Sequence, residues 1–431
     1  MQDTELYTKL LSLGPGWRVS KVDLDMDRDR IDVWVETTGS GTWLCPECGT
    51  AGSTYDHTAE QVWRHLDTCQ CRTFVHARLP RTACKEHGVR QVAAPWAGPR
   101  SRFTLLMERR LIDTLKECDV TGCCRLQGVS WDQGWGIIER AVRRGRARKP
   151  HRVPAYIGVD EKSFAKRHNY ETLVCDLERG TIEYVVDDRK QESLETYFRG
   201  FTAEELEGVK AAAMDMWDPY IAATKAHVPQ AEEKIVFDRF HVTRLVSVAV
   251  DKVRRQEHKA LIVQGDERLK GTKYLWLANK ENVPEWRQQE FDAIRKGNLR
   301  TGRAWAIKEV LRQFWNYTYA GWAQKFFNRW YFWATHSRLP PIIKAAKTLK
   351  AHLPNMLTYF KHRISNATSE GLNSKIQIVK QMACGFRNRD HYKLAIYFHC
   401  GGLDLYPAEA LSRPLHIGGT HSKPGRTSKE S

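Results

Sequence analysis

The spacing of hydrophobic positions changes several times along the chain, and each change predicts a different kind of element. Over residues 1–98 apolar and polar residues alternate in short runs such as 31–35, which is typical of β-strands with one buried face. A module of this size rarely buries enough apolar surface to be stable alone. We therefore expect a small β-rich module that a bound metal ion stabilises.

Helical spacing begins near residue 102, and residues 99–143 predict a helix-turn-helix. A first helix would cover residues 120–127, Gly128 would make the turn, and Ser130 would cap a second helix over 131–142. Gly134 and Gly136 each destabilise a helix interior by about 1 kcal/mol relative to alanine, so a plain helical connector is the alternative. In a DNA-bound motif, the residues expected to face a groove are Asp132, Gln133, Trp135 and Arg140.

A basic stretch follows, and residues 144–154 predict a linker. A solvated hinge and a strap over DNA phosphates are compatible interpretations, because a flexible cationic arm binds any nearby phosphate backbone. The cations expected to bind DNA here are Arg143, Arg144, Arg146, Arg148 and Lys149.

From residue 155 short apolar runs alternate with helical spacing. The order is three strands, a helix, a strand, a helix and a strand, which is the ribonuclease H-like order. Helical spacing without a clear strand predicts an all-helical insertion at about 241–362, inside a catalytic domain over 155–410. Residues 411–431 predict a disordered basic tail. The expected strands are 155–160, 172–176, 181–186, 209–214 and 234–238, and the expected helices are 191–206 and 219–227.

Acidic residues end two of the predicted strands that would be neighbours. Asp160 ends the first and Asp215 follows the fourth, so their carboxylates would meet in such a sheet. Glu370 lies on a predicted helix from about residue 369, on the same polar face as Asn373. Three carboxylates form an all-oxygen site that suits two Mg²⁺ ions, although a solvated helix face is the alternative for Glu370.

Other acids compete for a place in this site. Asp238 ends the fifth strand and is the rival of Asp215; with His241 it would orient groups beside the site or contact DNA. Glu161 would point to the other side of its strand, and Asp218 precedes a proline and resembles a helix cap.

Two short motifs in the first module present metal ligands in pairs. Two residues separate Cys45 from Cys48, and two separate Cys84 from His87. Two such pairs complete a tetrahedral zinc site. A zinc site with four protein ligands is structural, because it has no open position for a substrate. Unrelated buried cysteines are the alternative. Further candidate ligands in this module are His57, Cys69 and Cys71.

The predicted fold class is therefore α/β: a ribonuclease H-like catalytic domain with an all-helical insertion, preceded by a small zinc-binding β module and a helix-turn-helix. The aromatic side chains over residues 305–333 are expected to be mostly core. As the alternative, a minority would stack on unpaired bases near a cleavage point, beside Lys308, Arg312, Lys325 and Arg329.

The charge balance narrows the class of partner. The chain has 68 Lys and Arg against 51 Asp and Glu, and a net charge of +17 points to nucleic acid or an anionic membrane. The sequence contains no run of about 18 apolar residues, the length that spans a membrane, and the first thirty residues lack an export signal. We expect a cytoplasmic DNA-binding protein without a membrane partner, whose 11 cysteines do not form a disulfide framework.

Several motifs in consistent order resemble bacterial insertion-sequence transposases of the ISL3 type. They are residues 45–49 (CPECG), 63–67 (WRHLD), 158–161 (GVDE), 214–217 (MDMW), 237–242 (FDRFHV), 370–376 (EGLNSKI) and 385–388 (GFRN). The resemblance implies a DDE transposase of the bacterial nucleoid that binds the double-stranded terminal inverted repeats of its element. It also implies metal-dependent cleavage at the element ends and joining of the freed 3′-hydroxyl to target DNA.

Residue by residue, the resemblance assigns Asp160, Asp215 and Glu370 to the triad. After the second acid, related transposases often carry a Cys or Asp separated from a His by two residues, and Asp238 with His241 fits that pattern. Some members have Cys where this chain has His87. Because both element ends must be held together, we expect a homodimer or a higher oligomer on DNA.

Two other functions are open on the sequence: a catalytically inactive DNA-binding regulator derived from a transposase, and an RNA-processing nuclease with the same sheet. The intact acids argue against the regulator. The terminal-repeat sequence, the target preference and the choice between copying and excision do not follow from the sequence.

Overall fold

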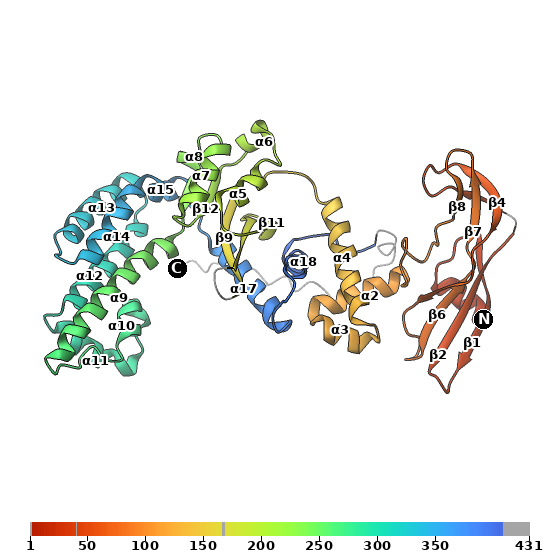
Figure 1. Cartoon of the computed structure of the whole chain (residues 1–431), viewed down its shortest axis with the longest axis horizontal. Helices are drawn as coiled ribbons and strands as arrows, with labels where there is room; N and C mark the ends of the chain where they lie inside the picture. The colour runs from red at the N-terminus through yellow and green to blue at the C-terminus, as the bar shows by residue number, and fades with distance from the viewer. Residues whose placement is uncertain (1, 40, 166–168, 408–431) are drawn as a thin grey trace, which may run out of the picture. The chain divides into compact units, whose positions relative to one another are not determined.

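The computed structural model describes residues 2–39, 41–165 and 169–407 (Figure 1). The chain divides into two compact units: Met1–Lys149 with the segment that starts at Leu403, and Pro150–Gly402. The predicted tail, residues 411–431, lies outside the described residues. In the part of the chain that the structure describes, no helix is long and apolar enough to cross a membrane.

The first unit opens with helix α1 (Asp3–Leu10) and two four-stranded sheets, ordered β1-β2-β6-β5 and β3-β4-β7-β8. The alternation at residues 31–35 is explained by β2, whose residues Ile31, Val33 and Val35 are buried in the core of the first sheet. The strands are β1 (Trp17–Asp25), β2 (Arg30–Thr37), β3 (Thr42–Leu44), β4 (Ala51–His57), β5 (Gln61–Arg64), β6 (Arg72–Ala77), β7 (Pro80–Cys84) and β8 (Gly88–Gln91).

Three helices follow: α2 (Leu105–Glu117), α3 (Val120–Gln127) and α4 (Trp131–Arg148). Gly128 turns the chain with a left-handed φ of 63°, which glycine adopts without strain. The Ser130 and Gln133 side chains each accept a hydrogen bond from the other's backbone N–H, a capping box that starts α4. Gly134 is glycine because an added Cβ would lie 3.0 Å from the Cys124 sulfur, where α3 crosses α4.

The predicted linker differs from the structure over its first half, because α4 continues to Arg148. Gly145 lets the segment from Leu403 pack closely on α4, since an added Cβ would lie only 2.7 Å from the Cβ of Leu403. The segment from Leu403 thus packs on α4 within the first unit, where the sequence placed it in the catalytic domain.

The second unit contains a five-stranded sheet of order β11-β10-β9-β12-β13. The pairs β9–β10 and β10–β11 are antiparallel, whereas β12 runs parallel to both β9 and β13. All five predicted strands are present. Their bounds are β9 (Tyr156–Ala165), β10 (Asn169–Asp176), β11 (Thr181–Asp187), β12 (Ala211–Met214) and β13 (Ile235–Phe237).

Helices cover both faces of this sheet. Alternate residues of β9 show the two faces: Val159 packs in the core with Leu194 and Ala223, whereas Gly158 faces Ser369. The helices on the Val159 side are α5 (Gln191–Phe198) and α7 (Asp218–His227), with α6 (Ala203–Glu207) and α8 (Ala231–Lys234) beside them in the chain. The single helix expected over 191–206 is therefore two shorter ones. Helix α17 (Ala367–Met382) lies on the Gly158 side, and α18 (Arg389–Cys400) packs on β11.

A helical segment connects β13 to α17. Its longest helix, α9 (Arg239–Val263), begins directly after β13 and packs against α12 and α14 (Figure 1). The other elements are α10 (Lys273–Leu277), η1 (Lys280–Asn282), α11 (Glu285–Lys296), α12 (Arg300–Leu311), η2 (Arg312–Asn316), α13 (Ala320–Thr335), α14 (Pro340–Ala351), α15 (Leu353–Leu357) and α16 (Tyr359–His362).

Candidate catalytic and metal-binding sites

Two of the predicted catalytic acids lie at matching positions of neighbouring strands. Strands β9 and β12 are parallel, and their last paired residues are Gly158 and Ala213. Asp160 and Asp215 each follow two residues later, so their carboxylates extend from the same edge of the sheet. Asp160 lies in the part of β9 that extends beyond the paired residues, whereas Asp215 comes directly after the end of β12.

A third carboxylate lies at the same level. Strand β13 is parallel to β12 with Phe237 beside Met214, and the backbone N–H of Asp238 donates to the Met214 carbonyl oxygen at 2.9 Å. Asp238 therefore occupies the position on β13 that matches Asp215. Three neighbouring strands thus place three acids at one level of the sheet.

Helix α17 approaches this edge closely. Gly158 makes the approach possible, because an added Cβ would lie 2.3 Å from the Ser369 hydroxyl oxygen. Ser369 in turn contacts the Cys175 sulfur at 2.8 Å. One turn further along α17, the Asn373 amide nitrogen donates to Oδ2 of Asp160 at 2.7 Å. The polar face expected on this helix therefore faces the sheet at Asp160.

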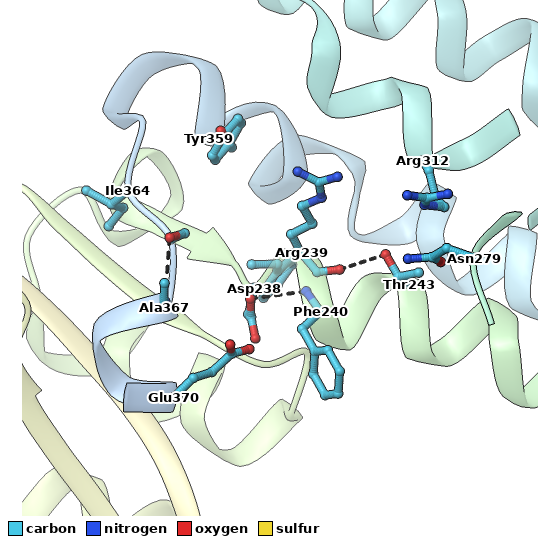
Figure 2. A pocket seen from close by; sticks show the side chains of 12 residues that line it. Asp238, Arg239, Phe240, Thr243, Asn279, Arg312, Tyr359, Ile364, Ala367 and Glu370 are labelled. Carbon is cyan, nitrogen blue, oxygen red and sulfur yellow. Dashed lines mark hydrogen bonds between the residues drawn. The ribbon is translucent and has the colours of Figure 1, made fainter. Parts of the chain in front are cut away.

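Glu370 is exposed at the start of α17 and lines a pocket with Asp238. Figure 2 shows the two side chains pointing toward one another at one end of the pocket. The pocket has a volume of about 420 Å³. Its other lining residues include Arg239, Phe240, Arg312 and Tyr359, so the helical segment supplies most of its walls.

The hydrogen bonds distinguish Asp238 from Asp215. Asp238 is buried, and both of its oxygens have protein partners: the backbone N–H of Phe240 at 3.1 Å and Nδ1 of His241 at 2.9 Å. Asp238 is thus the N-cap of α9. In contrast, Oδ1 of Asp215 is buried without a hydrogen-bond partner. Asp215 therefore has a carboxylate oxygen with both lone pairs free. Each oxygen of Asp160 accepts one hydrogen bond, from the Glu161 backbone N–H or from Asn373, and keeps one lone pair for a metal ion.

Burial and the mutual repulsion of the acids shift the pKa values of this group of side chains. Burial, together with the charges of Asp215 and Asp238, raises the pKa of Asp160 to about 6. Burial also raises the pKa of Asp215, to which the charge of Asp238 adds. Burial opposes the protonation of His241, but its hydrogen bond to Asp238 and the charges of the three acids raise the pKa of the imidazole. A cation between these acids would relieve their repulsion.

Glu161 follows Asp160 and points to the opposite side of the sheet, as alternation predicts. There the Arg189 guanidinium contacts its carboxylate at 3.0 Å and lies over the Trp217 ring at 4.0 Å. The charge of Arg189 also lowers the pKa of Asp215 against the effect of burial. Sequence reasoning missed Arg189, because it lies in a turn after β11 and belongs to no motif.

The four predicted zinc ligands converge in the first unit. Cys45 and Cys48 lie between β3 and β4, Cys84 and His87 lie at the β7–β8 turn, and the pairing of β4 with β7 brings the two turns together. Among the described residues, this is the one group of three or more His, Cys, Asp or Glu whose ligand atoms all lie within 4.8 Å of one another. The further candidates His57, Cys69 and Cys71 lie outside it.

The individual contacts fit a closed tetrahedral zinc site. The Cys48 and Cys84 sulfurs lie 3.6 Å apart, and Nδ1 of His87 lies 3.6 Å from Cys84 and 3.9 Å from Cys45. Hydrogen bonds with Thr50 lower the pKa of the Cys48 thiol to about 6, which favours the thiolate that zinc binds. Three sulfurs and one nitrogen at these distances suit a structural zinc ion.

The residues expected to contact DNA have different surroundings. Trp135 is buried, so its predicted position in a groove is wrong. Gln133 is exposed but accepts the Ser130 capping bond, and Arg140 lies 3.8 Å from Glu108. Arg143, Arg146 and Arg148 are exposed, and Lys149 is half-buried.

Two of the linker cations are held within the first unit. Arg144 contacts the buried Glu108 at 3.0 Å and donates to the Leu405 carbonyl oxygen. Arg148 contacts Asp404 at 2.9 Å. The sequence predicted that both would bind DNA.

Three family descriptions match successive parts of the chain. A zinc finger of the transposases IS204, IS1001, IS1096 and IS1165 matches residues 41–87, and the helix-turn-helix domain of transposase family ISL3 matches residues 92–142. The ISL3 transposase domain, described as Transposase, matches residues 157–396. The first two matches cover the cysteine cluster and the three helices, and the third covers the acidic edge of the sheet.

Two relatives that match this chain over most of their length are also transposases. The chain is 26% identical over 404 residues to a transposase for insertion sequence element IS1001 from Bordetella parapertussis, covering 91% of this chain and 98% of that protein. It is 25% identical over 421 residues to a transposase for insertion sequence element IS1557 from Mycobacterium tuberculosis, covering 90% of this chain and 93% of that protein. Since the transposase domain match alone spans more than half of the sequence, the chain belongs to the ISL3 family of DNA transposases.

Proposed function

We propose that this transposase binds the terminal inverted repeats of its insertion sequence, cleaves DNA at the element ends and joins the freed 3′-hydroxyl to target DNA. Asp160, Asp215 and Glu370 are the proposed catalytic triad, and they would hold two Mg²⁺ ions. The observation that carries the proposal is the pairing register, because Asp160 and Asp215 extend from matching positions of parallel strands.

The fold that we propose for the second unit is a ribonuclease H-like domain with a helical insertion before Glu370. Support comes from the sheet, in which three antiparallel strands are followed by two strands parallel to β9. The helical segment from α9 to α16 interrupts this pattern before α17. Such an insertion brings residues of the helical segment into the pocket that Asp238 and Glu370 line.

Asp215 is the better second ligand than Asp238. A metal ligand needs an oxygen lone pair directed at the ion, and the buried Oδ1 of Asp215 has no other partner. Both oxygens of Asp238 instead cap α9 and hold His241. Glu370 is exposed beside them and supplies the third carboxylate. The residues present thus fit hard divalent cations, which prefer oxygen ligands.

When bound, the two ions would activate the attacking oxygen and stabilise the departing 3′ oxygen of an in-line displacement. The protein's own residues position these groups. Asn373 holds Asp160 through Oδ2. Asp238 holds His241 by Nδ1 and favours its cationic form, which leaves the second ring nitrogen to donate to a phosphate oxygen. Arg239 in the pocket adds positive charge for the DNA backbone.

The two modules of the first unit would select the element ends. We propose that exposed residues of α4, such as Arg143 and Arg146, contact the terminal-repeat duplex while the zinc module stabilises the surrounding fold. Because two ends must be held in one complex, the active form would be at least a dimer on DNA. Light scattering of the DNA complex measures this, and one chain per pair of ends would contradict it.

The decisive experiment is cleavage of a supercoiled plasmid that carries both element ends, with Mg²⁺. We expect Asp215→Asn to abolish cleavage and Asp238→Asn to weaken it, because asparagine still caps α9 but holds His241 less well. Asp218→Asn, an exposed acid at the start of α7, is the matched control and should cleave normally. The reverse pattern would move the second ligand to Asp238. Specific binding without cleavage by the wild type would favour the inactive regulator.

A further inference from the structure

The helical segment contains a long stretch without acidic residues. From residue 310 to 369 the chain has no Asp or Glu, but it has nine Lys and Arg. The stretch covers η2 and helices α13 to α16. In a chain with 51 acidic residues this is a strongly one-sided charge distribution, and its surface suits a polyanion.

The tryptophans of this region divide into two groups. Trp305, Trp315 and Trp330 are buried, which agrees with the expectation that these rings form core. Trp322 and Trp333 are instead 56% and 42% exposed, so the expectation is wrong for them. Exposed apolar side chains that gather in one patch of a soluble protein mark a binding surface.

The exposed rings share one face of α13. Its inner residues Ala323, Phe327, Trp330 and Ala334 are buried in the core. The outer residues recur every three or four positions and so form one stripe along the helix. We call this stripe the aromatic–basic face, and it consists of Trp322, Lys325, Arg329, Phe332, Trp333 and His336.

Cations and aromatic rings lie next to one another along this face. The Lys325 ammonium lies 4.7 Å from the centre of the Trp322 ring. The His336 ring stacks on Phe332 with centroids 4.0 Å apart, and Phe332 is 64% exposed. Two of the cations that the sequence grouped with these rings lie elsewhere: Lys308 is buried, and Arg312 is held by Glu281 and Glu309.

We propose that the aromatic–basic face of α13 binds unpaired DNA nucleotides, with Trp322 and Trp333 stacking on bases and Lys325 and Arg329 contacting phosphates. Rings interleaved with cations are the usual means of binding single strands, because every base has a stacking face and every nucleotide a phosphate. The inference rests on the proposed function, since strand cleavage at the element ends releases strands whose bases can unpair.

Other occupants fit the face less well. Duplex DNA keeps its bases stacked inside, so it would meet the phosphate-binding cations but leave the rings unused. A second copy of the chain would place the same acid-free surface against itself in a two-fold contact, and like charges would repel. Unpaired DNA uses both the rings and the cations.

The test is binding of a fluorescein-labelled oligothymidylate of about 20 nucleotides, longer than a typical binding site, to the full zinc-loaded chain without Mg²⁺. We expect the double variant Trp322→Ala/Trp333→Ala to bind at least about tenfold more weakly by fluorescence anisotropy, because each lost stacking contact is large. The double variant Trp322→Phe/Trp333→Phe keeps the rings and should retain most of the affinity.

Trp286→Ala is the matched control. Trp286 is 82% exposed, but it lies on α11, where Glu285, Glu290 and Asp292 balance the charges of Arg287, Arg295 and Lys296. Its loss should leave oligothymidylate affinity unchanged. Lys325→Ala/Arg329→Ala should reduce the salt dependence of oligothymidylate binding. This variant provides a second test if the double tryptophan-to-alanine variant has a lowered melting temperature.

Three results with Trp322→Ala/Trp333→Ala would overturn the proposal. The first is wild-type affinity for oligothymidylate, and the second is an equal loss of affinity for a terminal-repeat duplex. The third is loss of self-association with unchanged DNA binding, which would make the face an interface between copies of the chain. Because the assay needs no cleavage, its result is independent of the plasmid experiment. Asp215→Asn should bind the oligonucleotide normally even where it abolishes cleavage.

Discussion

The side-chain nitrogen of Asn373 donates a hydrogen bond of 2.7 Å to Oδ2 of Asp160 and joins residues 213 positions apart in the chain. Asp160 belongs to β9, and Asn373 lies one turn after Glu370 on α17. Helix residues three apart share a face, so this bond sets the height and rotation of the turn that carries Glu370. Asn373 is therefore a positioning residue for two of the three proposed ligands.

Asn373→Ala should reduce cleavage by about 10- to 100-fold, the usual cost of losing a group that orients a metal ligand. The variant should also need more Mg²⁺ for half-maximal cleavage, whereas a purely structural loss would lower the melting temperature without changing this requirement. Gln377→Ala, one turn further along α17, is the control and should behave as the wild type. An unchanged Mg²⁺ requirement in Asn373→Ala would contradict the positioning role.

Gly158 should tolerate no side chain, because an added Cβ would lie 2.3 Å from Ser369 and 2.6 Å from the Cys175 sulfur. Gly158→Ala should destabilise the protein by about 1–3 kcal/mol, as overpacking of a close contact does, and should displace α17 from β9. Gly371→Ala is the matched control on α17, where an added Cβ meets nothing within 4 Å. It should stabilise the helix by up to about 1 kcal/mol. Chemical denaturation measures both, and equal stabilities would refute the packing argument.

Local sequence patterns predicted the elements well because their causes are local. Ser130 and Gln133 complete a capping box four residues long, and Gly128 supplies a left-handed turn that few other residues adopt. The Cys45 and Cys84 motifs likewise fold as short turns. For such features the residues that decide the structure are close neighbours in the chain.

Long-range features could not be predicted in the same way. The contact of Arg144 with Leu405 spans 261 positions, and nothing near Arg144 distinguishes it from the exposed Arg143. Similarly, the helical spacing of α13 predicts that one face is buried but does not show whether Trp322 or Trp330 lies on it. Which cations stay available for DNA depends on tertiary packing.

The zinc ligand set should accept cysteine in place of its histidine. Nε2 of His87 lies 3.6 Å from the Glu47 carboxylate, which leaves Nδ1 as the ligand atom beside Cys84. His87→Cys should therefore retain one zinc ion per chain, because four thiolates also form a tetrahedral site. His87→Ala should lose zinc and lower the melting temperature.

Zinc content by atomic absorption and thermal unfolding measure these effects. Cys69→Ser is the control, because Cys69 is exposed and lies outside the cluster. Loss of zinc from Cys69→Ser, or its retention by His87→Ala, would show that the fourth ligand has been misassigned.

Arg143 and Arg144 are adjacent but should have separable roles. Arg144 neutralises Glu108, which is only 3% exposed, and binds the Leu405 carbonyl oxygen. Arg144→Ala would leave a buried carboxylate with only the more distant Arg140 among its described partners, and should destabilise the first unit by about 3 kcal/mol.

Arg143 is exposed on α4, so Arg143→Ala should leave stability unchanged. It should instead weaken binding to the terminal-repeat duplex and reduce the slope of log affinity against log salt by about 1, because one phosphate contact is lost. Denaturation and salt-dependent anisotropy on both variants measure the difference, and a stable Arg144→Ala that loses DNA affinity would return Arg144 to the DNA-binding surface.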